Sequence, residues 1–343
     1  MVAGLSKAPA TAIDPHVRPL DPWRDGPAVA NLLELAFKDE IGGDSGGQRM
    51  IHMLRHYSPL DALTGDGMSG FVWIEQGQIV GNVSLQRNPA RRDTWVIGNV
   101  ATHPAWRNRG VSTALIGSAI AFARARGGRF VALQVVEGNW PALRVYERAG
   151  FRALGAVTHY RRPSVRAQAL PVAPRALSAR RARRADRDVV WAFARLNIPD
   201  DLTYAEPFDA RVYRLDWRWW LSNFFNGWRE QWLVAEAPNR SPDPGSAQTG
   251  SAQTGSAQIM GAIRTRVNFD SPEHHVELML DARGSVEDGI ALLVAGMSRF
   301  EGYVSRPLYC AQARPHEATH GALQAVGFQP IRTLVHMGLR VEG

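Results

Sequence analysis

The segment WRNRGVSTAL, residues 106–115, places two arginines and a glycine directly before a run with helical character. It follows VIGNVATHP, residues 96–104, which has the composition of a strand. A turn from strand to helix presents unpaired backbone N–H groups and the positive end of the helix dipole. Gly110 leaves these donors accessible because it has no Cβ, and Arg107 and Arg109 add positive charge. The segment therefore predicts a pyrophosphate site, although an ordinary turn with solvated arginines fits the segment alone equally well.

Strand and helix patterns alternate on both sides of this segment. A hairpin is expected around Gln76–Gly77–Gln78, and a helix that begins at Gly110 is expected to end at Gly127–Gly128. The pattern predicts a mixed α/β domain. Its expected strands are 16–20, the hairpin 70–88, 96–104, 129–138 and 151–162, and its expected helices are 23–40, 48–58, 110–127 and 140–150.

The second half of the chain repeats the first at a shift of 177 residues. The shift places Gly150–Phe151 on Gly327–Phe328, and the strand near Val100 on HHVELML, residues 274–280. We therefore expect two copies of one fold. Their predicted bounds are a disordered lead at 1–12, a first domain at 13–162, a linker at 163–174 and a second domain at 175–343, with a flexible low-complexity loop at 238–258.

Composition limits the class of protein. Hydrophobic residues make up 45% of the chain, yet no run approaches the ~18 apolar residues of a membrane span. The start of the chain lacks a signal-peptide core, and the single cysteine, Cys310, excludes an internal disulfide and a multi-cysteine metal site. We expect a cytoplasmic protein without a metal.

The net charge of +8 comes from arginine and raises the question of nucleic-acid binding. The densest basic stretch is RALSARRARRADRD, residues 175–188, near the expected domain junction. Elsewhere the arginines are spread along the chain. A solvated helix start or linker is therefore the favoured interpretation, and a nucleic-acid site is the alternative.

Two landmarks in the first copy resemble the GNAT superfamily of N-acetyltransferases. The segment 107–112, RNRGVS, is similar to the family's acetyl-CoA signature Q/R-x-x-G-x-G/A, and it follows a V-A-x-H-P strand end. Ser112 departs from the usual Gly or Ala. The second landmark follows at the expected spacing, as Asn139, Ala142, Tyr146 and Gly150–Phe151. The resemblance rests on motifs over residues 15–162 and on architecture alone over 175–343.

The resemblance implies two tandem GNAT-like domains, each a mixed, mostly antiparallel sheet flanked by helices, with acetyl-CoA as cofactor. The signature strand would splay from its neighbour, often through a bulge, and a backbone N–H near Val100 or Ala101 would polarise the thioester carbonyl. Tyr146 would protonate the departing CoA thiolate and contact the cofactor, although packing of its helix is an alternative role. The resemblance also implies that Val100, Ala101 and Thr102 contact pantetheine and that Asn139 contacts the cofactor arm. The implied pyrophosphate contacts are Arg107, Asn108, Arg109, Gly110, Val111, Ser112 and Thr113.

The general base is not evident from the sequence. Many relatives place a carboxylate on the signature strand, but VIGNVATHP contains none. Asn99 is the candidate for orienting a water that relays the amine proton. The other candidates are Glu34, Asp39, Glu40 and His103. Cys310 fits no nucleophilic role.

The second copy lacks the features of the first. Under the same shift, Arg107 falls on Gly284, Gly110 on Glu287 and Val111 on Asp288, so carboxylates would meet the pyrophosphate. Asn139 falls on His316 and Tyr146 on Leu323. The second copy is therefore expected to be degenerate.

These observations favour acetyl-CoA-dependent transfer to a primary amine of a small molecule or peptide, by direct attack in a ternary complex. A non-catalytic acyl-CoA-binding or sensor protein is the alternative from another class, and nucleic-acid binding is a weaker one. The aromatic segment 215–232 predicts either core packing or an acceptor wall. The sequence leaves the acceptor and a homodimer open.

Overall fold

The computed structural model describes residues 14–38, 51–52, 55, 69–164, 170–171, 178–205, 213, 215, 228–236, 259–314 and 316–341. The chain forms two compact units. The N-terminal unit comprises Met1–Leu154, Asp201–Phe208 and Val335–Gly343. The C-terminal unit comprises Gly155–Asp200 and Asp209–Leu334. Among the described helices, none is long and apolar enough to cross a membrane.

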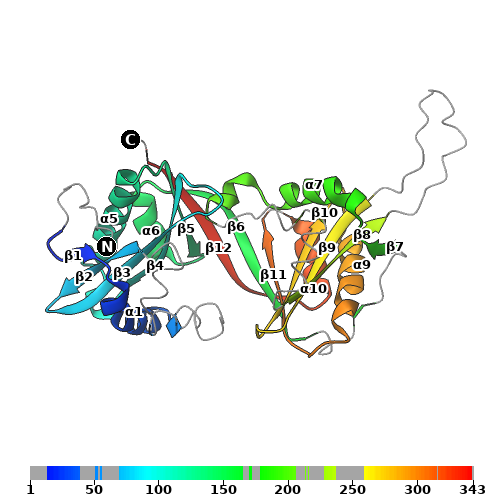
Figure 1. The fold of residues 1–343 in the computed structure, drawn as a ribbon, viewed down its shortest axis with the longest axis horizontal. Coiled ribbons are helices and arrows are strands. Elements are labelled where there is room, and N and C mark those ends of the chain that lie inside the picture. The colour runs from blue at the N-terminus through cyan, green and yellow to red at the C-terminus, as the bar shows by residue number, and fades with distance from the viewer. Residues whose placement is uncertain are drawn as a thin grey trace, which may run out of the picture. The chain divides into compact units, whose positions relative to one another are not determined.

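The N-terminal unit is built on a mixed sheet in the order β1-β2-β3-β4-β5-β12 (Figure 1). The first four strands pair antiparallel, and β4 and β5 pair parallel. The tight turn expected at Gln76–Gly77–Gln78 is a two-residue turn, in which Gln76 and Gly77 have φ values of 49° and 78°, and Gln78 begins β3. The first five strands in this order are β1 Val17–Pro19, β2 Ser69–Glu75, β3 Gln78–Arg87, β4 Thr94–Thr102 and β5 Phe130–Val136.

Helices cover both faces of this sheet. Helix α1, Pro22–Ala36, packs Val29 and Leu33 in one apolar cluster with Val72 of β2. Helices α5, Val111–Ala125, and α6, Trp140–Arg148, belong to a second cluster that contains the neighbouring β2 residues Phe71 and Trp73. Because successive strand residues point to opposite faces, α1 lies on one face and α5 with α6 on the other.

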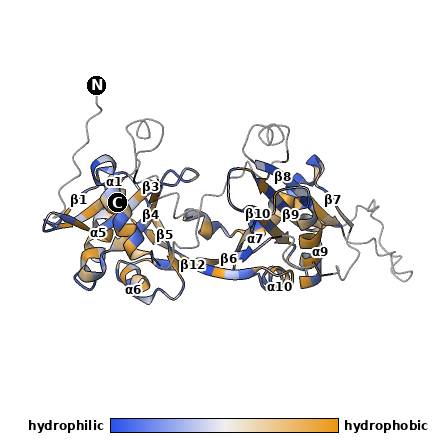
Figure 2. Ribbon diagram, turned by 90° about the horizontal axis from the view of Figure 1, so that it is seen from below, coloured by the Kyte–Doolittle hydropathy of each residue, from blue (hydrophilic) through white to orange (hydrophobic). Residues whose placement is uncertain are grey.

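The C-terminal unit repeats this order of elements. Its sheet runs β12-β6-β11-β10-β9-β8-β7, with β10 and β11 parallel. Helix α9, largely hydrophobic in Figure 2, packs Leu292 and Leu293 into the core of this unit. Its elements are β7 Ser178–Arg181, α7 Arg187–Asn197, β8 Trp228–Glu236, β9 Ile259–Asn268, β10 His274–Leu280, α9 Val286–Met297, β11 Leu308–Ala313 and α10 Glu317–Ala325. Short 3-10 turns occur at Pro104–Trp106, Arg184–Asp186, Asp200–Tyr204 and Ser298–Phe300.

The closing strands are exchanged relative to the continuous domains 13–162 and 175–343 expected from the sequence. The strand beside β5 is β12, Gln329–Arg340, whereas β6, Arg152–Arg162, lies beside β11. Met337 is buried in the core of the N-terminal unit, and Tyr160 in that of the C-terminal unit. The two strands have similar patterns, so the pattern predicts a strand without specifying which sheet it joins.

Several expectations fall partly or wholly outside the described residues. These are the lead 1–12, most of the helix 48–58, parts of the linker 163–174, most of the aromatic segment 215–232 and the loop 238–258. The basic stretch 175–188 is described from Ser178 onward. In it, the guanidinium group of Arg180 donates to Asp186 and Glu236 at 2.6–3.0 Å, so this arginine is engaged in internal ion pairs.

A buried ion pair joins β1 to the start of α1. Asp25 is only 3% exposed and accepts from Arg18 at 2.6 and 2.8 Å and from the backbone N–H of Asp21 at 2.9 Å. Burial alone would raise the pKa of Asp25, but these hydrogen bonds outweigh it and lower the pKa to about 2. The charged carboxylate therefore stabilises the folded state.

We predict that Asp25→Asn lowers the free energy of unfolding by about 2 kcal/mol at neutral pH. Because the folded-state pKa is depressed, the contribution is complete above pH ~4, the unfolded value, and is lost as the pH falls toward 2. Urea unfolding of both proteins between pH 3 and 7 measures this. A difference that stays constant over that range would contradict the assignment.

Candidate active site

Strands β4 and β5 separate within the N-terminal unit. Their parallel ladder runs from Thr94 to Ile97 on β4 and ends where Ile97 pairs with Leu133. Both strands continue, β4 to Thr102 and β5 to Val136. Beyond Ile97, the backbone of β4 on its β5 side therefore has no ladder partner, and we call this separation of the two strands the opening. An extended chain can add to such an edge through backbone hydrogen bonds.

A β-bulge occurs on β4 where the opening begins. On the β3 side, Gly98 pairs with Ser84 and Ala101 with Asn82, so Asn99 and Val100 together oppose one residue, Val83. Asn99 has φ 54°, in the left-handed region that residues other than glycine rarely adopt. The splay and the bulge that the family resemblance implied are thus present.

The start of α5 provides backbone donors without a side-chain cap. Gly110 is its N-cap residue at φ 82°, and no side chain of the described residues caps the helix. The end of β4 is tied to that turn because the Thr102 and Ser112 hydroxyls lie 2.9 Å apart. The guanidinium carbon of Arg109 lies over the Trp106 ring, 4.6 Å from its centre. Amides and positive charge therefore gather at one turn, as RNRGVS predicted.

Asn139 directly precedes α6, and Tyr146 lies within this helix. Asn139 is the N-cap residue, and its Oδ1 accepts from the backbone N–H of Ala142 at 3.3 Å. This capping role was not anticipated, and it leaves the amide Nδ2 as the group able to reach a ligand. Tyr146 is 6% exposed and packs edge-on against Phe151, with 6.1 Å between ring centres. Its packing and its expected catalytic role are compatible, since packing fixes the ring.

The candidate bases differ in their surroundings. Glu34 is paired with Arg55 at 2.6 Å on the surface of the unit. Asp39 and Glu40 lie outside the described residues. His103 follows β4, and its Nδ1 accepts from the backbone N–H of Ala105 at 3.2 Å.

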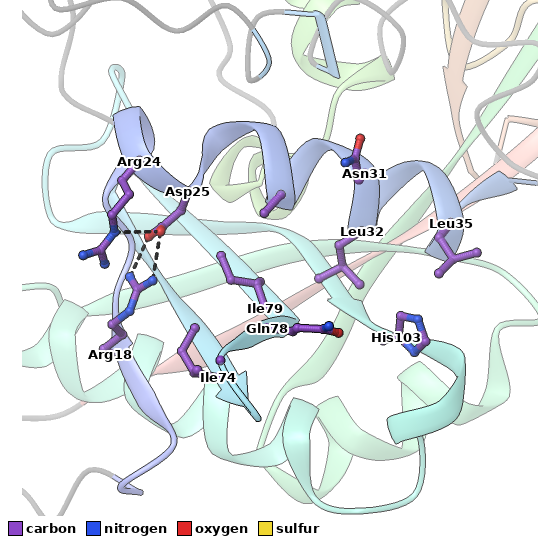
Figure 3. Close-up of a pocket in the computed structure, with 12 residues that line it drawn as sticks. Arg18, Arg24, Asp25, Asn31, Leu32, Leu35, Ile74, Gln78, Ile79 and His103 are labelled. Carbon is purple, nitrogen blue, oxygen red and sulfur yellow. Dashed lines mark hydrogen bonds and ion pairs between the residues drawn. The ribbon is translucent and has the colours of Figure 1, made fainter.

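A cavity of about 600 Å³ lies on the α1 face of the sheet, beside the end of β4 (Figure 3). Leu32, Ile74 and Ile79 form apolar walls, and Arg18 and His103 lie at its border. The sequence did not reveal this cavity because its lining comes from α1, the β2–β3 hairpin and the end of β4, which meet only in the fold.

Sequence reasoning also missed Asn82 and Ser84 of β3. Their side chains lie beneath the bulge, and the Nδ2 of Asn82 donates to the backbone carbonyl of Asn99 at 2.9 Å. The available signal was two polar residues at alternate positions in the apolar run VGNVSL, residues 80–85. Such residues share one face of a strand.

The corresponding helix of the C-terminal unit has a closed N-terminus. In α9 the Ser285 hydroxyl accepts from the backbone N–H of Asp288, and the Asp288 carboxylate accepts from that of Ser285, at 3.2 and 3.0 Å. This capping box satisfies donors that remain open in α5. Helix α9 also begins at Val286, two residues before the position that the 177-residue shift assigns to Val111. Under the shift, the first turn of α9 therefore corresponds to the end of the loop before α5. This turn carries the carboxylates of Glu287 and Asp288.

The thiol of Cys310 is buried and does not act as a nucleophile. It lies in β11 of the C-terminal unit, and burial raises its pKa to about 12. A neutral buried thiol is not a nucleophile at physiological pH. Among the described residues, no group of three or more His, Cys, Asp or Glu side chains is arranged to hold a metal ion.

Comparisons with known proteins agree with this geometry. The model of the acetyltransferase (GNAT) family matches residues 30–151. An uncharacterized N-acetyltransferase of Methanocaldococcus jannaschii is 35% identical over 126 residues, which cover 35% of this chain and 55% of that protein. The matched segment thus spans about half the length of that relative.

Two solved structures share the fold along nearly the whole chain. The GCN5-related N-acetyltransferase from Sphaerobacter thermophilus has a TM-score of 0.60 at 17% identity, covering 97% of this chain and 98% of its own. A tandem GNAT protein from the clavulanic acid biosynthesis pathway has a TM-score of 0.53 at 18% identity, covering 95% and 98%. At these identities the likeness concerns the fold alone.

The fold and these comparisons define the class as a protein of tandem GNAT architecture, which confirms the predicted α/β fold with two GNAT-like domains. Residues 30–151 match the model of the acetyltransferase (GNAT) family, so this part of the chain is similar to a GNAT acetyltransferase domain.

The left-handed conformation of Asn99 gives a prediction for stability. We expect Asn99→Val to have a free energy of unfolding about 1–2 kcal/mol below that of Asn99→Gly, because a β-branched residue is strained at positive φ and glycine is not. Urea unfolding of the two variants measures the difference. Equal stability would mean that the bulge does not hold this conformation.

Proposed function

We propose that the N-terminal unit transfers an acetyl group from acetyl-CoA to a primary amine of a small molecule or peptide. One observation carries this proposal: the unpaired backbone edge of β4 is connected to the uncapped backbone amides at the start of α5. The free edge of β4 begins after Ile97, the uncapped amides begin at Gly110, and the Thr102–Ser112 contact joins them. A ligand with an amide-bearing arm and a pyrophosphate matches this order of groups.

The chain's own groups fit acetyl-CoA along that path. The backbone of Val100, Ala101 and Thr102 would pair with the pantetheine arm. The amides from Asn108 to Thr113 would hold the pyrophosphate, with positive charge from Arg107 and Arg109. The Nδ2 of Asn139 would donate to the arm. Bound acetyl-CoA would supply an activated acyl carbon and a thiolate leaving group.

The reaction is direct transfer in a ternary complex. The amine nitrogen bonds to the acyl carbon as the carbon–sulfur bond breaks, and the sulfur keeps the electron pair. Tyr146 is proposed to give its phenolic proton to that sulfur, and a water oriented by Asn99 takes the proton that the amine loses. This water route is proposed because β4 carries no carboxylate. Positioning the amine against the acyl carbon contributes further to the rate.

The proposal assigns binding to one unit only. In the C-terminal unit the capping box of α9 occupies the helix start, and the shift places His316 and Leu323 where the first copy has Asn139 and Tyr146. Binding of one acetyl-CoA per chain, measured by titration calorimetry, supports this assignment. Two equivalent sites would contradict it.

We predict that Gly110→Asp weakens acetyl-CoA binding at least ~10-fold relative to Gly110→Asn. Both residues tolerate a left-handed conformation and have similar size, so the comparison isolates the added negative charge at the helix start. A Cβ at this position meets no atom within 4 Å, so the strain of both variants comes from the positive φ and is shared by them. Calorimetry at two salt concentrations measures the effect. Equal affinities would place the pyrophosphate elsewhere.

We predict that Tyr146→Phe lowers kcat about 100-fold or more while acetyl-CoA affinity changes little. Phenylalanine keeps the packing against Phe151 and removes only the hydroxyl. An amine-panel assay that monitors free CoA thiol measures turnover. Unchanged turnover would remove Tyr146 as the acid, and binding without turnover of any amine by the wild type would favour a non-catalytic sensor.

A further inference from the structure

Asn82 is a buried polar residue at the centre of the N-terminal sheet. It is 0% exposed, and its ladder partners Val72 and Ala101 both belong to the apolar cluster that packs under α1. An amide in such surroundings costs free energy unless its polar atoms are hydrogen-bonded. An apolar residue of similar size would avoid this cost, so the position calls for a specific explanation.

The amide nitrogen of Asn82 is engaged at the bulge. Nδ2 donates to the backbone carbonyl of Asn99 at 2.9 Å and lies 3.4 Å from the Ser84 hydroxyl, which also accepts from the Nδ2 of Asn99 at 3.4 Å. A flipped amide would set two oxygens against each other, so this network fixes the orientation of Asn82. Its Oδ1 is buried and has no hydrogen-bond partner among the described residues. The side chain is therefore used as a donor toward Asn99.

The planar peptide transmits this contact to the next residue. In a trans peptide the carbonyl of Asn99 and the N–H of Val100 lie in one plane and point in opposite directions. Asn82 belongs to β3, which lies on one side of β4, and the opening toward β5 lies on the other. Holding the Asn99 carbonyl toward Asn82 thus directs the Val100 N–H away from β3.

We infer that Asn82 is a positioning residue, which aims the Val100 N–H into the opening between β4 and β5 as the hydrogen-bond donor to the acyl oxygen of the thioester. This inference rests on the proposed function. It assigns the donor to Val100, where the sequence left Val100 and Ala101 as alternatives. It also accounts for the left-handed residue in β4, because the Asn82 hydrogen bond offsets the conformational cost of Asn99 at positive φ.

The test compares two replacements of Asn82 with a matched control. Asn82→Asp keeps the shape but replaces the donor with an acceptor. Asn82→Leu keeps approximately the volume and introduces no buried polar atom, so it remains informative if the aspartate variant fails to fold. Asn88→Asp is the control, because it makes the same donor-to-acceptor change at a buried asparagine beyond the end of β3, whose Nδ2 donates to the backbone carbonyl of Thr203 and not to the bulge.

The measurements are kcat, acetyl-CoA affinity, and the infrared carbonyl frequency of bound acetyl-CoA labelled with carbon-13 at the acetyl carbonyl. We expect both Asn82 variants to lower kcat about 10- to 100-fold with little change in affinity, and to move the carbonyl frequency toward that of the unpolarised thioester. Asn88→Asp should match the wild type in kcat and in the carbonyl frequency. A purely structural role would lower stability and affinity without moving the carbonyl frequency of the bound fraction.

The two proposals fail in different ways. If wild type binds acetyl-CoA with a shifted carbonyl frequency, and both Asn82 variants keep that frequency and kcat, the positioning role is wrong while the proposed function stands. If wild type does not bind acetyl-CoA, the proposed function itself is wrong.

Discussion

The arrangement of the site depends on the early end of the β4–β5 ladder. A parallel pair normally satisfies the backbone groups of both strands, but here the pairing ends at Ile97 while both strands continue. The bulge at Asn99 and Val100 occurs just beyond this point, and the Asn82 amide holds the bulge from the other side. The backbone of β4 beyond Ile97 therefore lacks a ladder partner in β5 and is held in orientation by Asn82, as the proposed preorganised hydrogen-bond site requires.

The two copies of the fold differ at one helix start. In α5 the N-cap is a glycine whose conformation leaves the first amides open, whereas in α9 a serine and an aspartate satisfy the equivalent amides. A capping box stabilises a helix by the same donors that an anion would use. Anion binding at this position and internal capping are therefore alternatives, and α9 has the internal cap whereas the N-cap residue of α5 has none. The C-terminal unit keeps the architecture because its core depends on the apolar faces of α9 and β10, not on the loop.

Exchange of the closing strands makes each unit depend on sequence from both copies. The N-terminal unit is completed by Val335–Gly343, and the C-terminal unit includes Gly155 onward from the first copy. Phe151 and Met337, from opposite halves of the chain, are buried in the same core. The second copy is thus required to complete the unit that carries the proposed site, even though its own helix start is closed.

The sequence by itself determined the local elements and the chemistry of the loop. The alternation of strands and helices, the two-residue turn at Gln76–Gly77, and the glycine at the start of α5 follow from short-range patterns, because periodicity and backbone preferences act over a few residues. Tertiary structure alone decided the features that need partners distant in the chain. It brought Asn82 under Asn99, ended the β4 ladder at Leu133, and assigned β12 in place of β6 to the first sheet. Side-chain contacts across strands and the choice between two similar strands are set by packing over the whole domain, which no local pattern encodes.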